Sequence, residues 1–127
     1  MIEAVLCKNR EDDVVIKKLN DVPEKKVEGY EGISKHTVIG RDDGSREISL
    51  RYFSLKPGSS TPHHAHPFPH LVKIESGAGS VTDESGGQRA LQTGDYVYVK
   101  DNEIHHFTNT ATEQFDFICI VPDRGES

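Results

Sequence analysis

The chain has 127 residues and a formal net charge of −6 at neutral pH. This length is enough for one hydrophobic core but not for two full domains, so we expect a single domain spanning residues 1–127. The negative charge argues against a nucleic-acid partner or an anionic membrane surface, and no apolar run approaches the roughly 18 residues of a membrane span.

The N-terminal segment, MIEAVLCKNREDD, has no basic start and no long apolar stretch, so it is not typical of a signal peptide. The two cysteines, Cys7 and Cys119, are expected to stay reduced, because disulfide-bonded cysteines are typical of secreted chains. Both features favour a cytoplasmic protein.

Residues 1–34 are expected to form an extension of strand and loop ahead of the main fold. The stretch Glu11–Glu28 is charged and only weakly periodic. Within it, the apolar run Val14–Ile16 is a candidate strand at the edge of a sheet, and the remainder is predicted to be surface loop.

From His36 onward, apolar residues tend to alternate with polar ones, and clusters of Gly, Pro, Asp and Ser separate the alternating runs. Many short strands joined by regular turns predict an all-β fold, either an antiparallel barrel or a jelly roll. The predicted strands are His36–Ile39, Glu47–Leu55, Leu71–Glu75, Gly79–Val81, Gln88–Leu91, Tyr96–Val99, His105–Asn109 and Phe115–Val121.

Six of the seven histidines lie in two short clusters. Imidazole is the commonest metal-binding side chain, since its neutral nitrogen binds divalent transition metals near neutral pH. A domain this small has no general reason to gather its histidines in this way, so the clusters predict a metal site. The clustered residues are His63, His64, His66, His70, His105 and His106.

Strand geometry selects which rings of the first cluster can meet. Side chains at positions i and i+2 of an extended strand share a face, so His64 and His66 are predicted to point together and His63 to point away. The stiff segment Pro67-Phe68-Pro69 lets the chain turn back and present His70 as a third imidazole.

In the second cluster, His105 and Phe107 are predicted to share a face, and His106 to point away. Four imidazoles from two parts of the chain are therefore predicted to hold one divalent metal ion. The predicted ligands are His64, His66, His70 and His105. His63 and His106 are expected at the surface or behind the ligands, and the isolated His36 is expected to be structural.

These residues resemble the two sequence motifs of the cupin family, in particular small single-domain bacterial cupins. At the family's spacing, the first motif reads Gly58, His64-Ala65-His66, His70 and Gly77, and the second reads Gly94, His105 and Asn109. The resemblance covers residues 54–121 and implies a cupin jelly-roll barrel, or double-stranded β-helix. The run His-Ala-His-Pro-Phe-Pro-His and the closing Phe-Ile-Cys-Ile-Val-Pro are similar to small cupins with four-histidine manganese sites.

Two departures from the family pattern bear on the chemistry. His70 stands where the family usually has a Glu ligand, and Lys100 and Asn102 replace a Pro and a Gly. Asn still tolerates a left-handed turn, so the second change is mild. The first change removes a negative charge. Four neutral imidazoles leave a divalent ion at +2, which makes it a stronger Lewis acid that attracts anions.

The resemblance implies Mn or Fe as the ion, whereas imidazole donors alone favour Ni, Cu or Zn. In an octahedral shell, four protein ligands leave two positions for water, dioxygen or a substrate. A purely structural ion is disfavoured, because closed structural sites are usually zinc with thiolates and neither cysteine has ligand spacing.

The last predicted strand, Phe115–Val121, presents every second residue to the barrel interior. Phe117 and Cys119 are predicted to line the pocket together with Phe107, because small cupins with this ending place that strand beside the metal. The other inward residues of the strand are predicted to be core. Cys119 itself is expected to be a buried, inert thiol.

Two further residues are candidates for the pocket. Phe68, which lies between two predicted ligands, either supports the ligand loop or roofs the site. Arg51 lies in the strand Glu47–Leu55, whose inward face the sequence leaves open. If Phe53 and Leu55 point inward, Arg51 does too and can hold a carboxylate. Otherwise Arg51 is expected to form a salt bridge at the rim.

The leading hypothesis for function is a dioxygenase-type oxidoreductase that uses Mn or Fe and acts on a small organic molecule. The first alternative is a metal-dependent isomerase or lyase that stabilises an enolate, for which the sequence offers no general base apart from displaced water or His63. The second is a non-catalytic module that binds a small molecule. An exposed N-terminal strand and the family resemblance together predict a homodimer.

Overall fold

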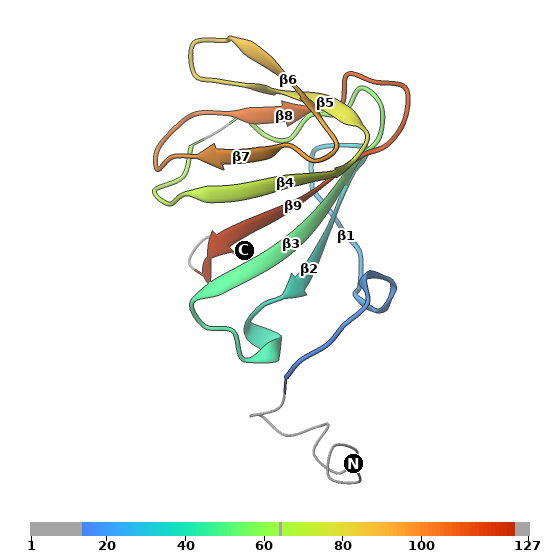
Figure 1. Cartoon of the computed structure of the whole chain (residues 1–127), viewed down its shortest axis with the longest axis vertical. Coiled ribbons are helices and arrows are strands. Elements are labelled where there is room, and N and C mark those ends of the chain that lie inside the picture. Colours follow the sequence, from blue (N-terminus) through green and yellow to red (C-terminus); the bar gives the residue numbers. More distant parts are fainter. Residues whose placement is uncertain (1–13, 64, 124–127) are drawn as a thin grey trace, which may run out of the picture.

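The strands form two antiparallel β-sheets (Figure 1). Buried apolar side chains from both sheets form the hydrophobic core between them. The computed structural model describes residues 14–63 and 65–123. Within these residues, the larger sheet has six strands in the order β1-β2-β3-β9-β4-β7, and the smaller sheet has three in the order β6-β5-β8. The predicted all-β jelly-roll fold is confirmed.

The strands are short and are connected by tight turns, as the punctuation of the sequence by Gly and Pro predicts. Two single-turn 3-10 helices, η1 (Leu19–Asp21) and η2 (Arg41–Asp43), interrupt the connections. The strands are β1 (Lys25–Lys26), β2 (Ile33–Ile39), β3 (Ile48–Leu55), β4 (His70–Ser76), β5 (Ala78–Thr82), β6 (Gln88–Gln92), β7 (Tyr96–Val99), β8 (His106–Thr108) and β9 (Phe115–Pro122). Each of the eight predicted strands overlaps one of these.

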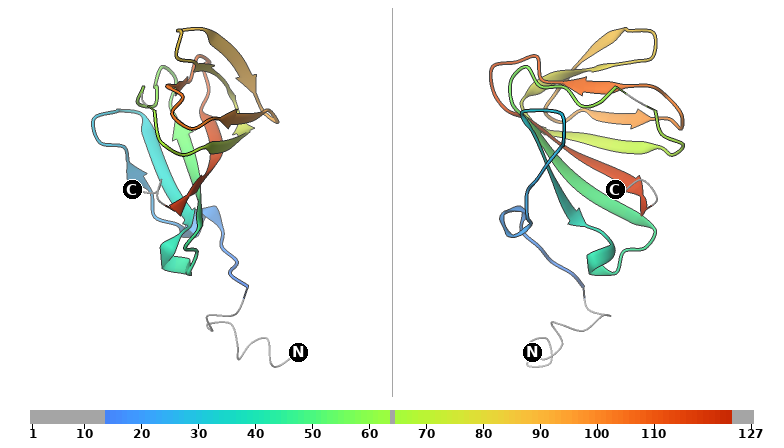
Figure 2. Two further views of the ribbon diagram at one scale, coloured as in Figure 1. Left: turned by 90° about the vertical axis from the view of Figure 1, so that its left-hand side faces the viewer. Right: turned by 180° about the vertical axis from the view of Figure 1, so that it is seen from behind.

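The edge strand predicted at Val14–Ile16 is wrong. Those residues are extended coil, with Val14 and Ile16 more than four-fifths exposed, and the chain there runs away from both sheets (Figure 2). The edge strand of the larger sheet is instead the two-residue strand β1, which is joined to β2 by a tight connection. Lys25 pairs with Lys35 of β2, and Lys26 pairs with Ser34. A very short edge strand that carries lysines resists pairing with another chain, so the charged residues protect the sheet edge.

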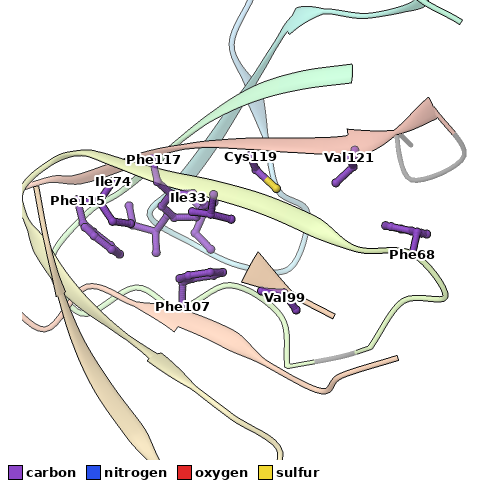
Figure 3. Packing of buried hydrophobic residues seen from close by; sticks show 11 residues of the cluster. Ile33, Phe68, Ile74, Val99, Phe107, Phe115, Phe117, Cys119 and Val121 are labelled. Atoms are coloured by element: carbon purple, nitrogen blue, oxygen red, sulfur yellow. The ribbon is translucent and has the colours of Figure 1, made fainter. Parts of the chain in front are cut away.

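Strand β9 supplies the centre of the core, as its alternation predicts. Phe115, Phe117, Cys119 and Val121 are each at most 3 % exposed and point between the sheets (Figure 3). They meet Ile74 of β4 and Phe107 of β8, which approach from the two sheets. Burial of each such large side chain stabilises the fold by roughly 1.5–3 kcal/mol.

The turn between β4 and β5 depends on Gly77. Its φ of 82° is left-handed, and a Cβ there would lie 2.2 Å from the Gln114 carbonyl oxygen. We expect Gly77→Ala to lower the free energy of unfolding by about 2–4 kcal/mol, since it adds backbone strain to a backbone clash. Gly86→Ala is the matched control, because Gly86 has a φ of 89° with no atom within 4 Å of its Cβ position.

Urea denaturation followed by circular dichroism measures both effects. The control should lose only about 1 kcal/mol, which is the cost of the left-handed backbone alone. Equal losses in the two variants would contradict the close packing of β4 against the start of β9.

None of the described residues belongs to a helix that is long and apolar enough to cross a membrane.

Candidate metal centre

Three of the four predicted ligands lie together at one end of the core. His70 begins β4, His105 immediately precedes β8, and His66 lies in the loop before β4. Their ring centroids are 5.1 Å apart for His66 and His70, 5.2 Å for His70 and His105, and 6.5 Å for His66 and His105. Residues distant in the sequence thus bring three imidazoles to one place.

The spacing of these rings fits a shared ion. Two imidazoles on one ion, with metal–nitrogen bonds of about 2.1 Å, have ring centres roughly 4.5 to 6.5 Å apart. As they stand, the described residues contain no group of three His, Cys, Asp or Glu side chains that could hold a metal ion. The fourth predicted ligand, His64, lies outside the described residues, so the four-histidine site stays a prediction.

The tautomer of His105 is set by its neighbour. Its Nδ1 lies 2.9 Å from the carbonyl oxygen of Glu103, which can only accept a hydrogen bond, so Nδ1 carries the proton. Nε2 then keeps its lone pair, and this is the arrangement typical of metal-binding histidines. The chemistry of the donor set therefore fits a divalent transition metal.

The loop before His105 joins the two histidine clusters. Asn102 has a φ of 62°, so it adopts the left-handed turn that the family's Gly usually supplies. Its backbone N–H donates to the carbonyl oxygen of His66 at 2.6 Å. The turn is closed by Glu103, whose carboxylate accepts from the backbone N–H of Lys100. Both departures at this motif are thus accommodated by the backbone.

Phe68 supports the rings and is not among the residues that line the adjacent cavity. It is 6 % exposed, stacks on His66 with ring centroids 4.7 Å apart and an interplanar angle of 13°, and lies 5.3 Å from the ring of His70. These contacts are those expected of a residue that supports the ligand loop, which is one of the two roles predicted for Phe68.

A cavity of about 210 Å³ opens beside the three rings. Its walls include the predicted pocket residues Phe107, Phe117, Cys119 and Arg51. Beyond Arg51, further inward residues of β2 and β3 that were not predicted to line the pocket add to the walls. The alternation of Ile33 with Lys35 was the available signal. These missed residues are Ile33, Lys35 and Phe53, together with Val27, Thr61 and Pro62 from the flanking loops.

Arg51 takes the inward of its two predicted positions. Its side chain is 9 % exposed, and Nη2 donates to the Cys119 Sγ at 3.1 Å. The guanidinium carbon lies 5.2 Å from the ring centroid of Phe53, a cation–π distance. The register of β3 therefore brings a positive charge to the wall of an otherwise mainly apolar cavity. Cys119 is 3 % exposed, in agreement with the predicted buried thiol.

The other histidines that the structure describes, His36, His63 and His106, do not line the cavity. His63 and His106 contact each other, with their Nδ1 atoms 2.8 Å apart, and neither lines the cavity beside the three candidate ligands, which agrees with the strand alternation. Burial, followed by the nearby rings of His63 and His105, lowers the pKa of His106. The Nδ1 of His36 lies 3.0 Å from the carbonyl oxygen of Val22 and donates to it, which is a structural role.

Comparison with known proteins gives one family. The Cupin domain family matches residues 51–121, which is more than half of the chain. Among curated proteins, Auxin-binding protein 1 from Arabidopsis thaliana is 23 % identical over 116 residues, which are 84 % of this chain and 58 % of that protein. The chain thus spans less than two thirds of the length of that relative.

Solved structures share the fold at low sequence identity. The polyketide cyclase RemF from Streptomyces resistomycificus has a TM-score of 0.82 and 21 % identity, over 87 % of this chain and 80 % of that one. A predicted oxalate decarboxylase from Thermotoga maritima has a TM-score of 0.75 and 18 % identity, over 85 % and 98 %. A cupin-2 domain from Rhodospirillum rubrum has a TM-score of 0.73 and 22 % identity, over 89 % and 77 %. At these identities the likeness concerns the fold alone.

Proposed function

This chain belongs to the cupin family, and on that premise we propose that it is a metal-dependent enzyme acting on a small organic molecule. One observation carries the proposal. The rings of His66, His70 and His105 gather at the wall of a mainly apolar cavity of about 210 Å³. A concave apolar site with a few convergent polar groups is the usual setting for small-molecule binding.

The ion would be held by His64, His66, His70 and His105. It would supply Lewis acidity, since neutral imidazoles leave its charge undiminished. The hydrogen bond from His105 to the Glu103 carbonyl fixes one ring with Nε2 available. Manganese or iron is favoured by the family resemblance, and nickel, copper or zinc by the donor type alone.

The chain's own residues prepare the cavity for a substrate. Phe53, Phe107 and Phe117 form apolar walls that exclude water, and Phe117 contacts both other rings at centroid distances of 5.3 and 4.9 Å. Arg51 and Lys35 add positive charge to the wall, which favours an anionic substrate. An oxidoreductase of dioxygenase type uses these features directly, because it needs an apolar, water-poor site and no dedicated base.

An isomerase or lyase is the second candidate, and the names of similar structures favour it. They include a polyketide cyclase and a sugar phosphate isomerase from Silicibacter pomeroyi. Such a reaction needs a general base. His63 was the sequence candidate, but it pairs with His106 and does not line the cavity. Of the two general bases considered from the sequence, this leaves water displaced from the metal site.

Oxygen consumption separates the two reaction classes. Protein loaded with Fe(II) or Mn(II) is incubated with small enolisable carbonyl compounds such as pyruvate and acetylacetone. Turnover-linked oxygen uptake supports the dioxygenase, and anaerobic deuterium exchange into the carbonyl compound supports the isomerase or lyase. A third outcome is tight binding of one of these carbonyl compounds that persists in His70→Ala, with neither oxygen uptake nor deuterium exchange in the wild type. That outcome would identify a non-catalytic binding module and contradict the proposal of an enzyme.

We propose a second copy of this chain as the partner, seated on the outer face of the larger sheet. Leu71, 53 % exposed, lies directly between Tyr98 of β7 and Ile120 of β9, so apolar side chains run across neighbouring strands there. On this face Lys73 forms an ion pair with Glu75 at 3.1 Å, and the Asp116 carboxylate accepts a hydrogen bond from the Tyr52 hydroxyl at 2.8 Å. An apolar face whose charged side chains already have partners within the chain can pack against its own copy despite the net charge of the chain.

We expect Leu71→Glu to convert the dimer to a monomer, because it places a charge in the centre of an apolar contact. Light scattering during size exclusion should then report the chain mass of 14.1 kDa instead of twice that value. Gln88→Glu, on an exposed position of the smaller sheet, is the matched control and should stay dimeric. A wild-type monomer, or a dimer in both variants, would contradict this interface.

A further inference from the structure

The contact between His63 and His106 lies on the opposite side of the chain from the cavity. His106 begins β8, and His63 lies in the segment that runs beside β8 on its free side, where the Thr61 backbone N–H donates to the Phe107 carbonyl oxygen. The two Nδ1 atoms are 2.8 Å apart and the ring centroids 4.7 Å apart. This contact has no part in the function proposed above.

Two nitrogens bound to one ion at about 2.1 Å lie about 3 Å apart when their bonds form a right angle. The observed separation of 2.8 Å is close to that value, so chelation requires each ring to turn until both Nδ1 lone pairs face the ion, with little change in the distance between them. The ordinary alternative is a single hydrogen bond, in which one Nδ1 carries the proton and donates to the other. An ion would replace that one shared proton.

A second observation points to a ligand at the same place. Thr82 of β5 is the direct cross-strand partner of His106, so the two side chains share the outer face of the smaller sheet. Thr82 is 6 % exposed, and within the described part of the chain its Oγ1 is buried with no hydrogen-bond partner. Buried hydroxyls nearly always have a partner, and water in the shell of a bound ion would provide one.

We propose that His63 and His106 form a second site for a divalent transition metal, separate from the cavity. Two imidazoles with water completing the shell suit Cu(II), Ni(II) or Zn(II). Because His63 adjoins His64 and His106 adjoins His105, the ion joins the two chain segments that also carry candidate cavity ligands. An ion bound by His63 and His106 therefore links these two segments on the outer face of the smaller sheet, away from the cavity.

The test is a Zn(II) titration of untagged, full-length protein by calorimetry, with bound zinc counted by elemental analysis. The wild type should bind two ions per chain, His63→Ala one, and His70→Ala one, because each substitution removes a different site. The double variant should bind none. Since His63 is exposed, His63→Ala should fold normally, and His106→Ala serves as an independent second variant.

Thermal stability gives a readout that does not depend on counting ions. An ion bound only by the folded chain raises Tm. Zn(II) should therefore raise the Tm of His70→Ala but leave that of the His63→Ala/His70→Ala double variant unchanged. One ion in the wild type that is lost in His70→Ala would overturn the outer site and leave the proposed function intact. One ion that is lost only in His63→Ala would support the outer site and overturn the cavity site.

Discussion

His105→Ala is expected to reduce the metal retained after dialysis from about one ion per chain to less than a tenth of that, since a single lost ligand costs 10- to 100-fold or more in affinity. The ring lies 5.2 Å from His70 and is oriented by the Glu103 carbonyl. Elemental analysis of protein purified without a polyhistidine tag measures the effect. Dialysis removes any ion held weakly by the outer pair.

His106→Ala is the matched control, because it removes an imidazole one position further along the chain. His106 contacts His63 on the outer face, so this variant should retain the dialysis-resistant ion. The same contrast is expected in the first cluster, with loss in His64→Ala and retention in His63→Ala. Equal losses at adjacent positions would mean that strand alternation does not select the ligands.

Most of the fold could be predicted because its strands obey a simple alternation. The inward positions of β9 are large and apolar, and every one of them is buried. The edge could not be predicted in the same way. Val14–Ile16 has the composition of a strand, but a strand there would need the free edge of β2 as its partner. The turn after β1 brings Lys25–Lys26 to that edge instead. Local composition does not encode that competition.

The candidate site shows the same division between local and long-range information. Spacing along the chain predicted that His66, His70 and His105 approach each other, and their rings do lie together. The inward position of Arg51 and the contribution of Lys35 depend on which face of β3 and β2 is buried. Both faces of β3 carry apolar residues, so the pairing of β3 with β9, and not its own pattern, decides its register.

Asn109→Ala is expected to lower the free energy of unfolding by about 3–5 kcal/mol, because three hydrogen bonds, one of them fully buried and two partly buried, lose a partner at once. Asn109 is 1 % exposed. Its Nδ2 donates to the carbonyl oxygens of Leu55 at 2.9 Å and Glu113 at 2.8 Å, and its Oδ1 accepts from the Ala111 backbone N–H at 2.9 Å. One side chain thus ties the end of β3 to the loop that leads into β9.

Asn109→Asp and Thr110→Ala separate hydrogen bonding from packing. The aspartate keeps the size and the acceptor for Ala111, but it places a carboxylate against two carbonyl oxygens, so it should destabilise at least as much as alanine. Thr110 is exposed, and its replacement should cost less than about 0.5 kcal/mol. Urea denaturation measures all three. If Asn109→Asp were as stable as the wild type, the hydrogen bonds that Asn109 donates to Leu55 and Glu113 would not be what requires Asn at this position. The Asn that ends the second motif would then need an explanation other than anchoring of the loop.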